Sequence, residues 1–263
     1  MSTHDRPEPS VVHTREGGVA VLRLNEPECL NALSAGIKDG LEAAIAQALA
    51  DPAVRAILLT GTGRAFCAGG DIRTMSAPRP VEVRARLRRS HEWLLPLIQS
   101  DKPVVVALNG IAAGAGFSLA LAGDIVVAGE DASFRAGFPG IGAVPDLGLA
   151  YLLPRAVGLN RAKDILLTNR PVPIGEALAM GLVARVVPAV ELLATALALA
   201  RQLADGPMSL GLTKVLLARG AELSLDGFFD LEALAQATAF ASDDFAEGVQ
   251  AFRGKRGPTF RGS

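Results

Sequence analysis

The sequence has little cysteine and no long apolar run. Its 263 residues include only Cys29 and Cys67, too few for a disulfide framework in a chain of this size, which favours a reducing compartment. No apolar stretch approaches the roughly 18 residues that a membrane-spanning helix needs. The opening MSTHDRPEPS is polar and contains proline, so it resembles neither a secretory signal nor an Arg-rich transit peptide. We therefore expect a soluble, cytoplasmic protein that does not bind membranes.

The sequence also lacks an excess of either charge. Its 26 Lys and Arg residues nearly balance 27 Asp and Glu residues, so no overall field attracts nucleic acid or an anionic membrane. Walker, HExxH, paired CxxC and GxSxG motifs are missing as well, which removes support for nucleotide hydrolysis, zinc catalysis and serine hydrolysis. We expect no bound metal and no nucleic-acid partner.

Short β-rich runs alternate with longer helical patterns over the first half of the chain. Val11–Glu16 and Val19–Leu24, separated by two glycines, predict a β-hairpin. Further strands are expected at Ala56–Thr60, Val104–Leu108 and Ile125–Ala128, and helices at Ser34–Ala50, Pro80–Gln99 and Phe117–Ala122. Strands that alternate with helices in this way predict an α/β domain.

From Asp146 onward the patterns are almost entirely helical, with one brief strand near Val183–Val187. Helices are expected at Asp146–Val157, Arg161–Thr168, Ile174–Met180, Ala189–Ala204, Ser209–Gly220, Ser224–Ala241 and Phe245–Phe252. We therefore expect an α/β core over residues 1–200 and a helical region over residues 201–263. The helical region is amphipathic, and helices that cannot cover their own core often pack on a neighbour, so we expect it to mediate oligomerisation.

Two glycine-rich segments each follow a predicted strand. Gly61–Asp71 is too rich in glycine to continue as strand or helix, so we expect a loop, and Asn109–Gly116 is expected to form a second turn. Gly70 can present its backbone N–H because glycine tolerates unusual angles, and Ala115 lies where a helix starts. Two such donors are what an oxyanion hole requires. Ordinary tight turns that close βα units remain the alternative.

The pair of segments resembles the crotonase superfamily, which comprises enoyl-CoA hydratases and isomerases. Arg64–Ile72, RAFCAGGDI, is similar to the first oxyanion motif of that family, and Lys102–Gly116, KPVVVALNGIAAGAG, is similar to the second. Weaker similarity extends from Leu24–Leu33 to Glu247–Phe252, so it covers nearly the whole chain. The resemblance implies a spiral of ββα repeats with a C-terminal helical trimerisation region, and a homotrimer or a dimer of trimers.

The resemblance also implies the substrate and its contacts. The substrate is expected to be an acyl-CoA thioester, with no separate cofactor because coenzyme A is part of the substrate. Gly70 and Ala115 would supply the two N–H donors that hold the thioester oxygen. Cys29, Leu30 and Ala68 would line the path of the coenzyme through backbone contacts.

The acids of the family's hydratases are missing from this sequence. Hydratases carry two glutamates, and Ser118 and Phe138 occupy those positions here, so addition of water by two glutamates is in doubt. Asp146, in GAVPDLG, resembles the single catalytic aspartate of members that shift a double bond and of 1,2-epoxyphenylacetyl-CoA isomerases. We therefore favour an enoyl-CoA isomerase with Asp146 as acid and base, and keep enoyl-CoA hydratase as an alternative.

A structural role for Asp146 competes with the catalytic one. An aspartate before an apolar run is a preferred helix N-cap, because its carboxylate accepts from a free amide of the first turn. The sequence does not separate the cap from the catalyst.

His91 is a second candidate for chemistry. Crotonase-type 4-chlorobenzoyl-CoA dehalogenases are similar in using a histidine in this region with an aspartate placed like Asp146. This leaves dehalogenation or thioester hydrolysis as an alternative, although a lone helical histidine is more often an exposed polar residue. A family member that binds acyl-CoA without turning it over is a further alternative from a different class.

Several other residues are expected near the substrate. Asp71 and Ile72 directly follow Gly70, with Asp71 holding the loop by hydrogen bonds, and Phe138, Val144 and the Met75–Arg89 segment are expected to shape the acyl pocket. Lys255, with Arg256, could meet the phosphates of coenzyme A or belong to a solvated tail.

Two further features have simpler interpretations. Cys67 is interpreted as a packing residue. Gly114 and Gly116 could open a dinucleotide-binding helix, but Leu119 stands where that fingerprint has its third glycine.

Overall fold

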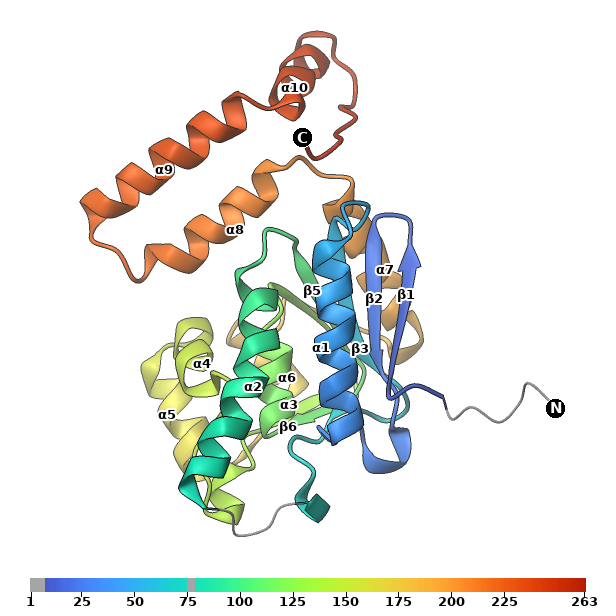
Figure 1. Cartoon of the computed structure of the whole chain (residues 1–263), viewed down its shortest axis with the longest axis vertical. Helices are drawn as coiled ribbons and strands as arrows, with labels where there is room; N and C mark the ends of the chain where they lie inside the picture. The colour runs from blue at the N-terminus through green and yellow to red at the C-terminus, as the bar shows by residue number, and fades with distance from the viewer. Residues whose placement is uncertain (1–7, 75–78) are drawn as a thin grey trace, which may run out of the picture.

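A computed structural model describes residues 8–74 and 79–263 of the chain. Figure 1 shows an α/β body in the lower part of the view, from which the last helices, coloured orange and red, extend as a separate layer. Within the described residues, no helix combines the length and the apolarity needed to cross a bilayer.

Six strands form the main sheet, in the spatial order β1-β2-β3-β5-β7-β10. Only β1 and β2 are antiparallel, as the predicted hairpin requires, and all other neighbours are parallel. The bounds of these strands are β1 Val11–Glu16, β2 Val19–Leu24, β3 Ala56–Gly61, β5 Val104–Leu108, β7 Ile125–Gly129 and β10 Arg185–Val187. All five residues of β5 are buried, which agrees with a central strand covered on both faces.

A second sheet of four short strands, in the order β4-β6-β8-β9, was not predicted. Its members are β4 Ala65–Cys67, β6 Ile111–Ala113, β8 Ser133–Arg135 and β9 Pro171–Pro173. The expectation that Gly61–Asp71 is entirely a loop was therefore wrong, because β4 lies inside it. Strands of three residues are too short to show the alternation by which strands are recognised in a sequence.

The two sheets together explain the path of the chain. The pairs β3 and β4, β5 and β6, and β7 and β8 each place their first strand in the six-stranded sheet and their second strand in the four-stranded one. Helices follow these pairs, so successive units stack beside one another. The predicted spiral of ββα repeats is confirmed.

The helices agree with the sequence patterns except at some ends. They are α1 Ala35–Ala50, α2 Pro80–Gln99, α3 Ala115–Leu121, α4 Leu149–Val157, α5 Leu159–Thr168, α6 Ile174–Ala179, α7 Leu192–Ala204, α8 Ser209–Gly220, α9 Leu225–Phe240 and α10 Asp243–Arg253, with short 3₁₀ turns at Pro27–Cys29, Ile72–Thr74, Phe138–Ile141 and Ala189–Glu191. The helix expected from Asp146 begins only at Leu149. Leu147 and Gly148 have φ angles of 47° and 84°, which a helix does not allow.

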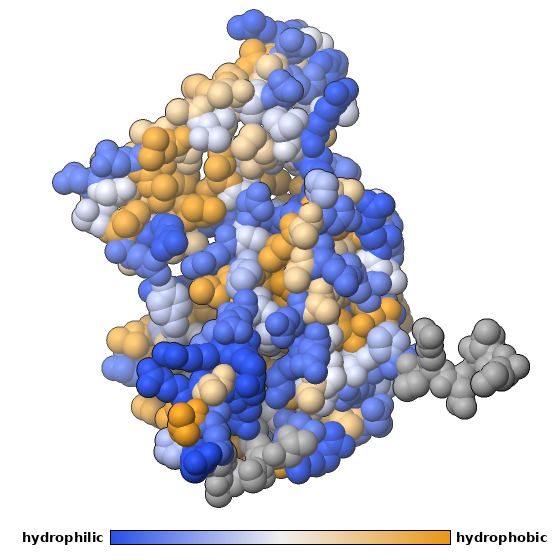
Figure 2. All heavy atoms as spheres, in the orientation of Figure 1, coloured by the Kyte–Doolittle hydropathy of each residue, from blue (hydrophilic) through white to orange (hydrophobic). Residues whose placement is uncertain are grey.

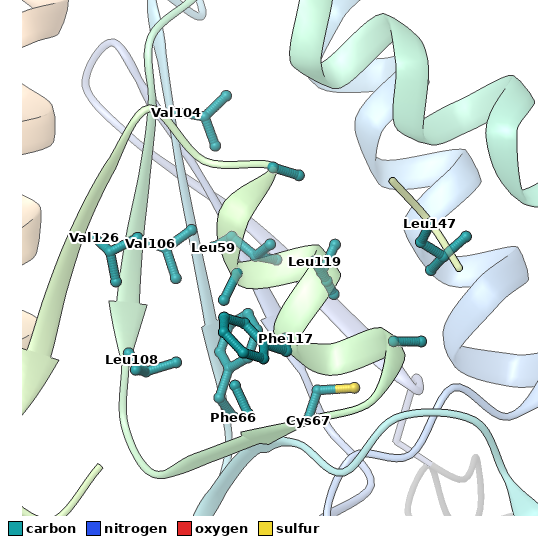
Figure 3. Close-up of a cluster of buried hydrophobic side chains, with 14 of the residues drawn as sticks. Leu59, Phe66, Cys67, Val104, Val106, Leu108, Phe117, Leu119, Val126 and Leu147 are labelled. Atoms are coloured by element: carbon teal, nitrogen blue, oxygen red, sulfur yellow. The ribbon is translucent and has the colours of Figure 1, made fainter. Parts of the chain in front are cut away.

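The core has two layers, one on each face of the main sheet. Figure 3 shows the first layer, in which Phe66 and Phe117 meet beside strands β3 and β5. The rings of Phe117 and Phe134 lie with centroids 4.6 Å apart. Helix α7 covers the other face, where Ala196 and Ala200 pack in a separate buried cluster. Through Phe117, helix α3 packs in the first layer, and it begins at the end of the second glycine segment.

The boundary predicted near residue 200 falls inside α7. Because α7 packs on the main sheet, it belongs to the α/β core. The outer helical layer begins after Ala204, at the turn that leads into α8.

Helix α8 is attached to the core at two points. Lys214, whose side chain is 9% exposed, forms an ion pair with Asp124 at 2.8 Å and donates to the carbonyl oxygen of Lys102 at 3.0 Å. Beyond the end of α8, the carboxylate of Glu222 accepts a hydrogen bond from the hydroxyl of Tyr151 in α4. A cleft of about 820 Å³ lies between α2, α4 and α8.

The two glycine segments contact each other through backbone atoms. A Cβ atom at Gly116 would lie 2.1 Å from the carbonyl oxygen of Cys67, and one at Gly69 would lie 2.6 Å from that of Ala113. No side chain fits at either point, since real Cβ atoms do not approach backbone oxygen so closely. Glycine at both positions thus allows β4 and the start of α3 to meet.

We predict that Gly116→Ala destabilises the fold by about 3 kcal/mol, because the added methyl group meets a backbone oxygen that cannot move aside. The matched control is Gly175→Ala in α6, where a Cβ meets nothing within 4 Å. The control should stay unchanged or gain about 0.5 kcal/mol from the better helix propensity of alanine. Urea unfolding followed by circular dichroism measures both values, and equal stabilities of the two variants would contradict the contact.

Candidate functional site

A small pocket brings together three residues singled out in the sequence: Gly70, Ala115 and Asp146. Its enclosed volume is about 50 Å³, and it is lined by Leu33, Lys38, Gly70, Asp71, Arg86, Leu87, Ser90, Ala115, Asp146 and Leu147. The lining comes from the first glycine segment, the start of α3, helices α1 and α2, and the turn before α4. We call this the Asp146 pocket.

Two backbone amides in the Asp146 pocket are free to donate. Ala115 is the first residue of α3, so its N–H has no acceptor within the helix. Neither this amide nor that of Gly70 has an acceptor among residues 8–74 and 79–263. A Cβ at Gly69 would lie 3.3 Å from the amide nitrogen of Ala115, which shows how closely the two segments approach. The pocket therefore has two N–H donors from two separate loops.

The carboxylate of Asp146 lies in the same pocket, and one of its two oxygen atoms has no hydrogen-bond partner among the described residues. Its Oδ1 atom is buried and has no partner within the described part of the chain. Its side chain does not cap α4, whose N-cap residue is Gly148 and has no side-chain cap. The capping interpretation of Asp146 was therefore wrong. A buried carboxylate oxygen left without a partner is costly, so it points to a role outside folding.

The electrostatic surroundings of Asp146 have opposing effects on its protonation. Burial raises the pKa of this carboxyl, because the charged form loses its water. The positive charge of Arg86 is the largest opposing influence, and His91 and Lys38 also act to lower the pKa. The net effect is a pKa above the ordinary value for aspartate, which suits a group that must both take and return a proton.

Ser118 of α3 binds the backbone of Asp146. This serine is fully buried in α3, and its hydroxyl donates to the carbonyl oxygen of Asp146 at 2.9 Å. By resemblance, Ser118 was expected at the position of one hydratase glutamate. Its hydroxyl instead binds the backbone of the aspartate.

Asp71, at the end of the first glycine segment, binds the arginine of the turn that follows. Its buried carboxylate accepts from Nε and Nη2 of Arg73 at 2.8 and 3.0 Å, and from the amide of Arg73 at 3.1 Å. The hydrogen bonds to Arg73 are the main reason that the pKa of Asp71 is lowered. Asp71 therefore contributes an ion pair to the pocket wall.

The residues expected along the coenzyme path lie just outside the pocket. The amide of Ala68 donates to the carbonyl oxygen of Leu30 at 3.0 Å, and Leu30 has a φ angle of 54° at the end of the turn that contains Cys29. Ile72 is 67% exposed on the adjoining turn. The structure thus brings Cys29, Leu30 and Ala68 together beside the first glycine segment.

Other predicted residues lie away from the Asp146 pocket. Phe138 is buried in the core, and Val144 is 80% exposed, while the apolar wall of the pocket is formed by Leu33, Leu87 and Leu147. Within the Met75–Arg89 segment, residues 75–78 lie outside the described part, and Arg86 and Leu87 reach the pocket. Lys255 is exposed after α10 and does not line the pocket.

Lys255's neighbour Arg256 is engaged elsewhere. Its guanidinium makes two hydrogen bonds to the carboxylate of Glu247, at 2.6 and 2.8 Å. This ion pair ties the C-terminal tail to α10.

The large cleft between α2, α4 and α8 adjoins the Asp146 pocket. Leu147 lines both spaces, and His91 lies on α2 at the edge of the cleft with an exposed side chain. The cleft is otherwise largely apolar, with walls that include Leu94, Leu95, Ile98, Leu152, Leu217 and Ala218. An acyl chain that begins at the pocket has an apolar space beside it.

Cys67 is confirmed as a packing residue. It is fully buried next to Phe66, and burial raises the pKa of its thiol to about 12. A thiol with such a pKa is not a nucleophile at neutral pH.

Sequence reasoning missed Lys38 as a member of the site, and it included Arg86 only as part of the Met75–Arg89 segment. They come from the faces of two helices that pack together, α1 and α2. No motif marks either residue, and lysines and arginines on helices are usually solvated. Only the fold shows that both turn toward Asp146.

Comparisons with known proteins identify the family of the chain. The model of the family Enoyl-CoA hydratase/isomerase matches residues 14–263. The chain is 40% identical over 253 residues to a 1,2-epoxyphenylacetyl-CoA isomerase of Escherichia coli, covering 94% of this chain and 96% of the relative. It is 33% identical over 249 residues to a short-chain-enoyl-CoA hydratase of Clostridium acetobutylicum, covering 94% and 95%.

A solved structure shows the same fold. The crystal structure of an enoyl-CoA hydratase/isomerase from Cupriavidus metallidurans superposes with a TM-score of 0.91 at 31% identity, covering 98% of each chain. Because the family match covers nearly the full length of the chain, the dinucleotide-binding interpretation of Gly114 and Gly116 is rejected. With its paired glycine segments, its spiral fold and these relatives, the chain belongs to the enoyl-CoA hydratase/isomerase family of acyl-CoA enzymes.

Proposed function

We propose that the protein is an enoyl-CoA isomerase that forms a thioester enolate in the Asp146 pocket. The observation that carries the proposal is the buried, unpartnered Oδ1 atom of Asp146 in the same pocket as the free amides of Gly70 and Ala115. Two aligned donors stabilise an oxyanion by about 3 kcal/mol each at the barrier. The thioester oxygen would sit between these amides, with its α-carbon facing Asp146.

The proposed reaction needs one acid–base group. Asp146 would remove a proton from the substrate, the negative charge would pass to the thioester oxygen, and the proton would return to a different carbon of the same face. Bonds and charges balance without a second acid. Leu33, Leu87 and Leu147 keep water from the carboxylate, which raises its basicity.

Hydration is the second candidate, because relatives named hydratases are among those that match. Addition of water by two carboxylates needs a second acid beside Asp146. Among residues 8–74 and 79–263, the only other carboxylate that lines the Asp146 pocket is that of Asp71, which is bound to Arg73. This favours isomerisation over hydration.

A role for His91 would favour dehalogenation or thioester hydrolysis. His91 lies within electrostatic reach of Asp146 but is exposed and lines the neighbouring cleft. An acyl-CoA-binding protein without activity is the other alternative, and the free carboxylate of Asp146 argues against it.

We predict that Asp146→Asn lowers turnover of enoyl-CoA thioesters by about 10²- to 10⁴-fold, because asparagine cannot accept the proton. Purified protein is incubated with straight-chain and aromatic enoyl-CoA thioesters, and products are separated by mass and retention time. Hydration adds the mass of water and isomerisation does not. The matched control, Asp131→Asn, changes an exposed loop aspartate and should retain turnover.

The same variant separates catalysis from folding. Because the folded-state pKa of Asp146 is raised, its ionised form destabilises the fold at neutral pH, so Asp146→Asn should not lower Tm. Retained activity in Asp146→Asn, or exchange of the α-proton with deuterated water at the wild-type rate, would show that Asp146 is not the base. Wild-type protein that binds thioesters without any exchange would support the non-catalytic alternative.

We further predict a pH effect that depends on Arg86. Asp146 must be ionised to take a proton, so kcat/KM should fall with acidity around a pKa above that of an exposed aspartate. Arg86 lowers this pKa, and Arg86→Met should therefore move the acidic limb of the profile to higher pH. An unchanged limb in Arg86→Met would contradict the assignment of that limb to Asp146.

The outer helices support an oligomer as part of the proposal. Helix α9 has no buried residue, and its large apolar side chains are exposed: Leu225 by 66%, Phe229 by 53% and Leu234 by 68%. Figure 2 shows hydrophobic residues, in orange, gathered over α8 and α9 at the upper left of the molecule. We propose that copies of this chain cover these faces in a trimer, or in a dimer of trimers.

Sedimentation at micromolar concentration tests this assembly. We predict that the wild type sediments as a trimer or hexamer, and that Leu234→Glu shifts it toward smaller species, since a charge placed in an apolar interface must lose its water. Leu167→Glu on α5, at a residue 77% exposed, is the matched control and should keep the assembly. A monomeric wild type would contradict the proposal.

A further inference from the structure

Two cations line the Asp146 pocket without a partner. Lys38 on α1 and Arg86 on α2 are half-buried, and both line the same small space as the two amides and Asp146. Neither side chain makes a hydrogen bond or an ion pair with any residue in the described ranges, 8–74 and 79–263. By contrast, Arg73 in the neighbouring turn forms a two-point ion pair with Asp71.

The charges of the pocket do not balance. Asp71 is neutralised by Arg73, which leaves Asp146 as the single unmatched carboxylate opposite Lys38 and Arg86. The pKa of Lys38 is lowered by burial first and by Arg86 next, and Arg89 acts in the same direction, whereas Asp39 and Asp71 raise it. The two cations therefore repel each other across a partly buried space. A ligand with a negative charge would relieve this repulsion.

The position of the cations indicates which part of a substrate they meet. They line the same pocket as the amides proposed to hold the thioester oxygen, so a bound thioester would place the acyl group near its reacting carbons beside them. The phosphates of coenzyme A are separated from the thioester by the whole pantetheine arm and cannot reach the same space. The enclosed volume of about 50 Å³ also allows only a short group beside Asp146.

We propose that Lys38 and Arg86 form a carboxylate subsite inside the acyl pocket, and that the preferred substrate is a coenzyme A thioester of a short dicarboxylic acid. The guanidinium of Arg86 can bind a carboxylate through two parallel hydrogen bonds, and Lys38 adds a point charge. This inference rests on the proposed function, because it takes the two amides as the site of the thioester. It adds the chemical class of the acyl group.

Binding of two saturated thioesters of equal chain length tests the subsite without turnover. Glutaryl-CoA carries a terminal carboxylate and valeryl-CoA does not, so the ratio of their Kd values isolates the carboxylate. Titration calorimetry on the full-length protein should show glutaryl-CoA bound at least about tenfold more tightly than valeryl-CoA, as expected for charge-assisted hydrogen bonds. Raising the salt concentration should reduce this preference.

Variants assign the preference to the two cations. In Arg86→Met and in Lys38→Met the ratio of Kd values should fall about tenfold, whereas Arg86→Lys, which keeps the charge, should retain part of it. Arg88→Met changes an exposed arginine of the same helix and should keep the wild-type ratio. Thermal melts check that each variant is folded. If Arg86→Met is not folded, Arg86→Lys is used in its place to test the contribution of Arg86.

The outcomes separate this inference from the proposed function. If wild-type protein binds both thioesters equally, or if the preference survives in both methionine variants, the carboxylate subsite is overturned while the enolate site stands. If the two cations act only on Asp146, Arg86→Met shifts the pH profile but leaves the binding ratio unchanged, which also overturns the subsite. If neither thioester binds to wild-type protein, both the proposed function and the subsite fail.

Discussion

The backbone contact between the two glycine segments is the constraint on which the site depends. Gly116 lies against the carbonyl group of Cys67, and Gly69 lies against that of Ala113, at distances that leave no room for a side chain. Because of this contact, the first residue of α3 and the end of the first segment face one pocket. The pairing of β4 with β6 holds the two segments together, and the missing side chains let the amides of Gly70 and Ala115 come close.

The sequence allowed the long elements and the main parts of the site to be predicted. The hairpin of β1 and β2 and the ends of α2 agree with the structure, because six to twenty residues show a clear period. The second sheet was missed because its strands have only three residues. The start of α4 was misplaced because Leu147 adopts a positive φ angle, which is uncommon outside glycine and asparagine. Lys38 was missed, and Arg86 was not singled out within the Met75–Arg89 segment, because only packing of distant helices brings the two together.

Ser118 illustrates how one position can change its task within a shared fold. At the position that by resemblance corresponds to a hydratase glutamate, this chain has a hydroxyl that donates to the carbonyl oxygen of Asp146. Leu147 and Gly148, which come directly after Asp146 in the chain, have unusual positive φ angles, and the serine helps to hold this turn. The carboxylate of Asp146 is thus positioned by a backbone bond, and its own oxygen stays available. A residue that is oriented through its main chain keeps its side chain free for the role proposed for it.

The two attachments of α8 to the core limit the width of the cleft beside the Asp146 pocket. Lys214, in the middle of α8, is paired with Asp124, and Glu222, just after the C-terminal end of α8, binds Tyr151. A helix held to the core at both of these points resists outward rotation, so the cleft beside it widens only when one of the two attachments breaks. The size of an acyl group that enters this cleft is therefore limited by α8. Any selection of substrates by size depends on the distance between the two attachment points of the helix.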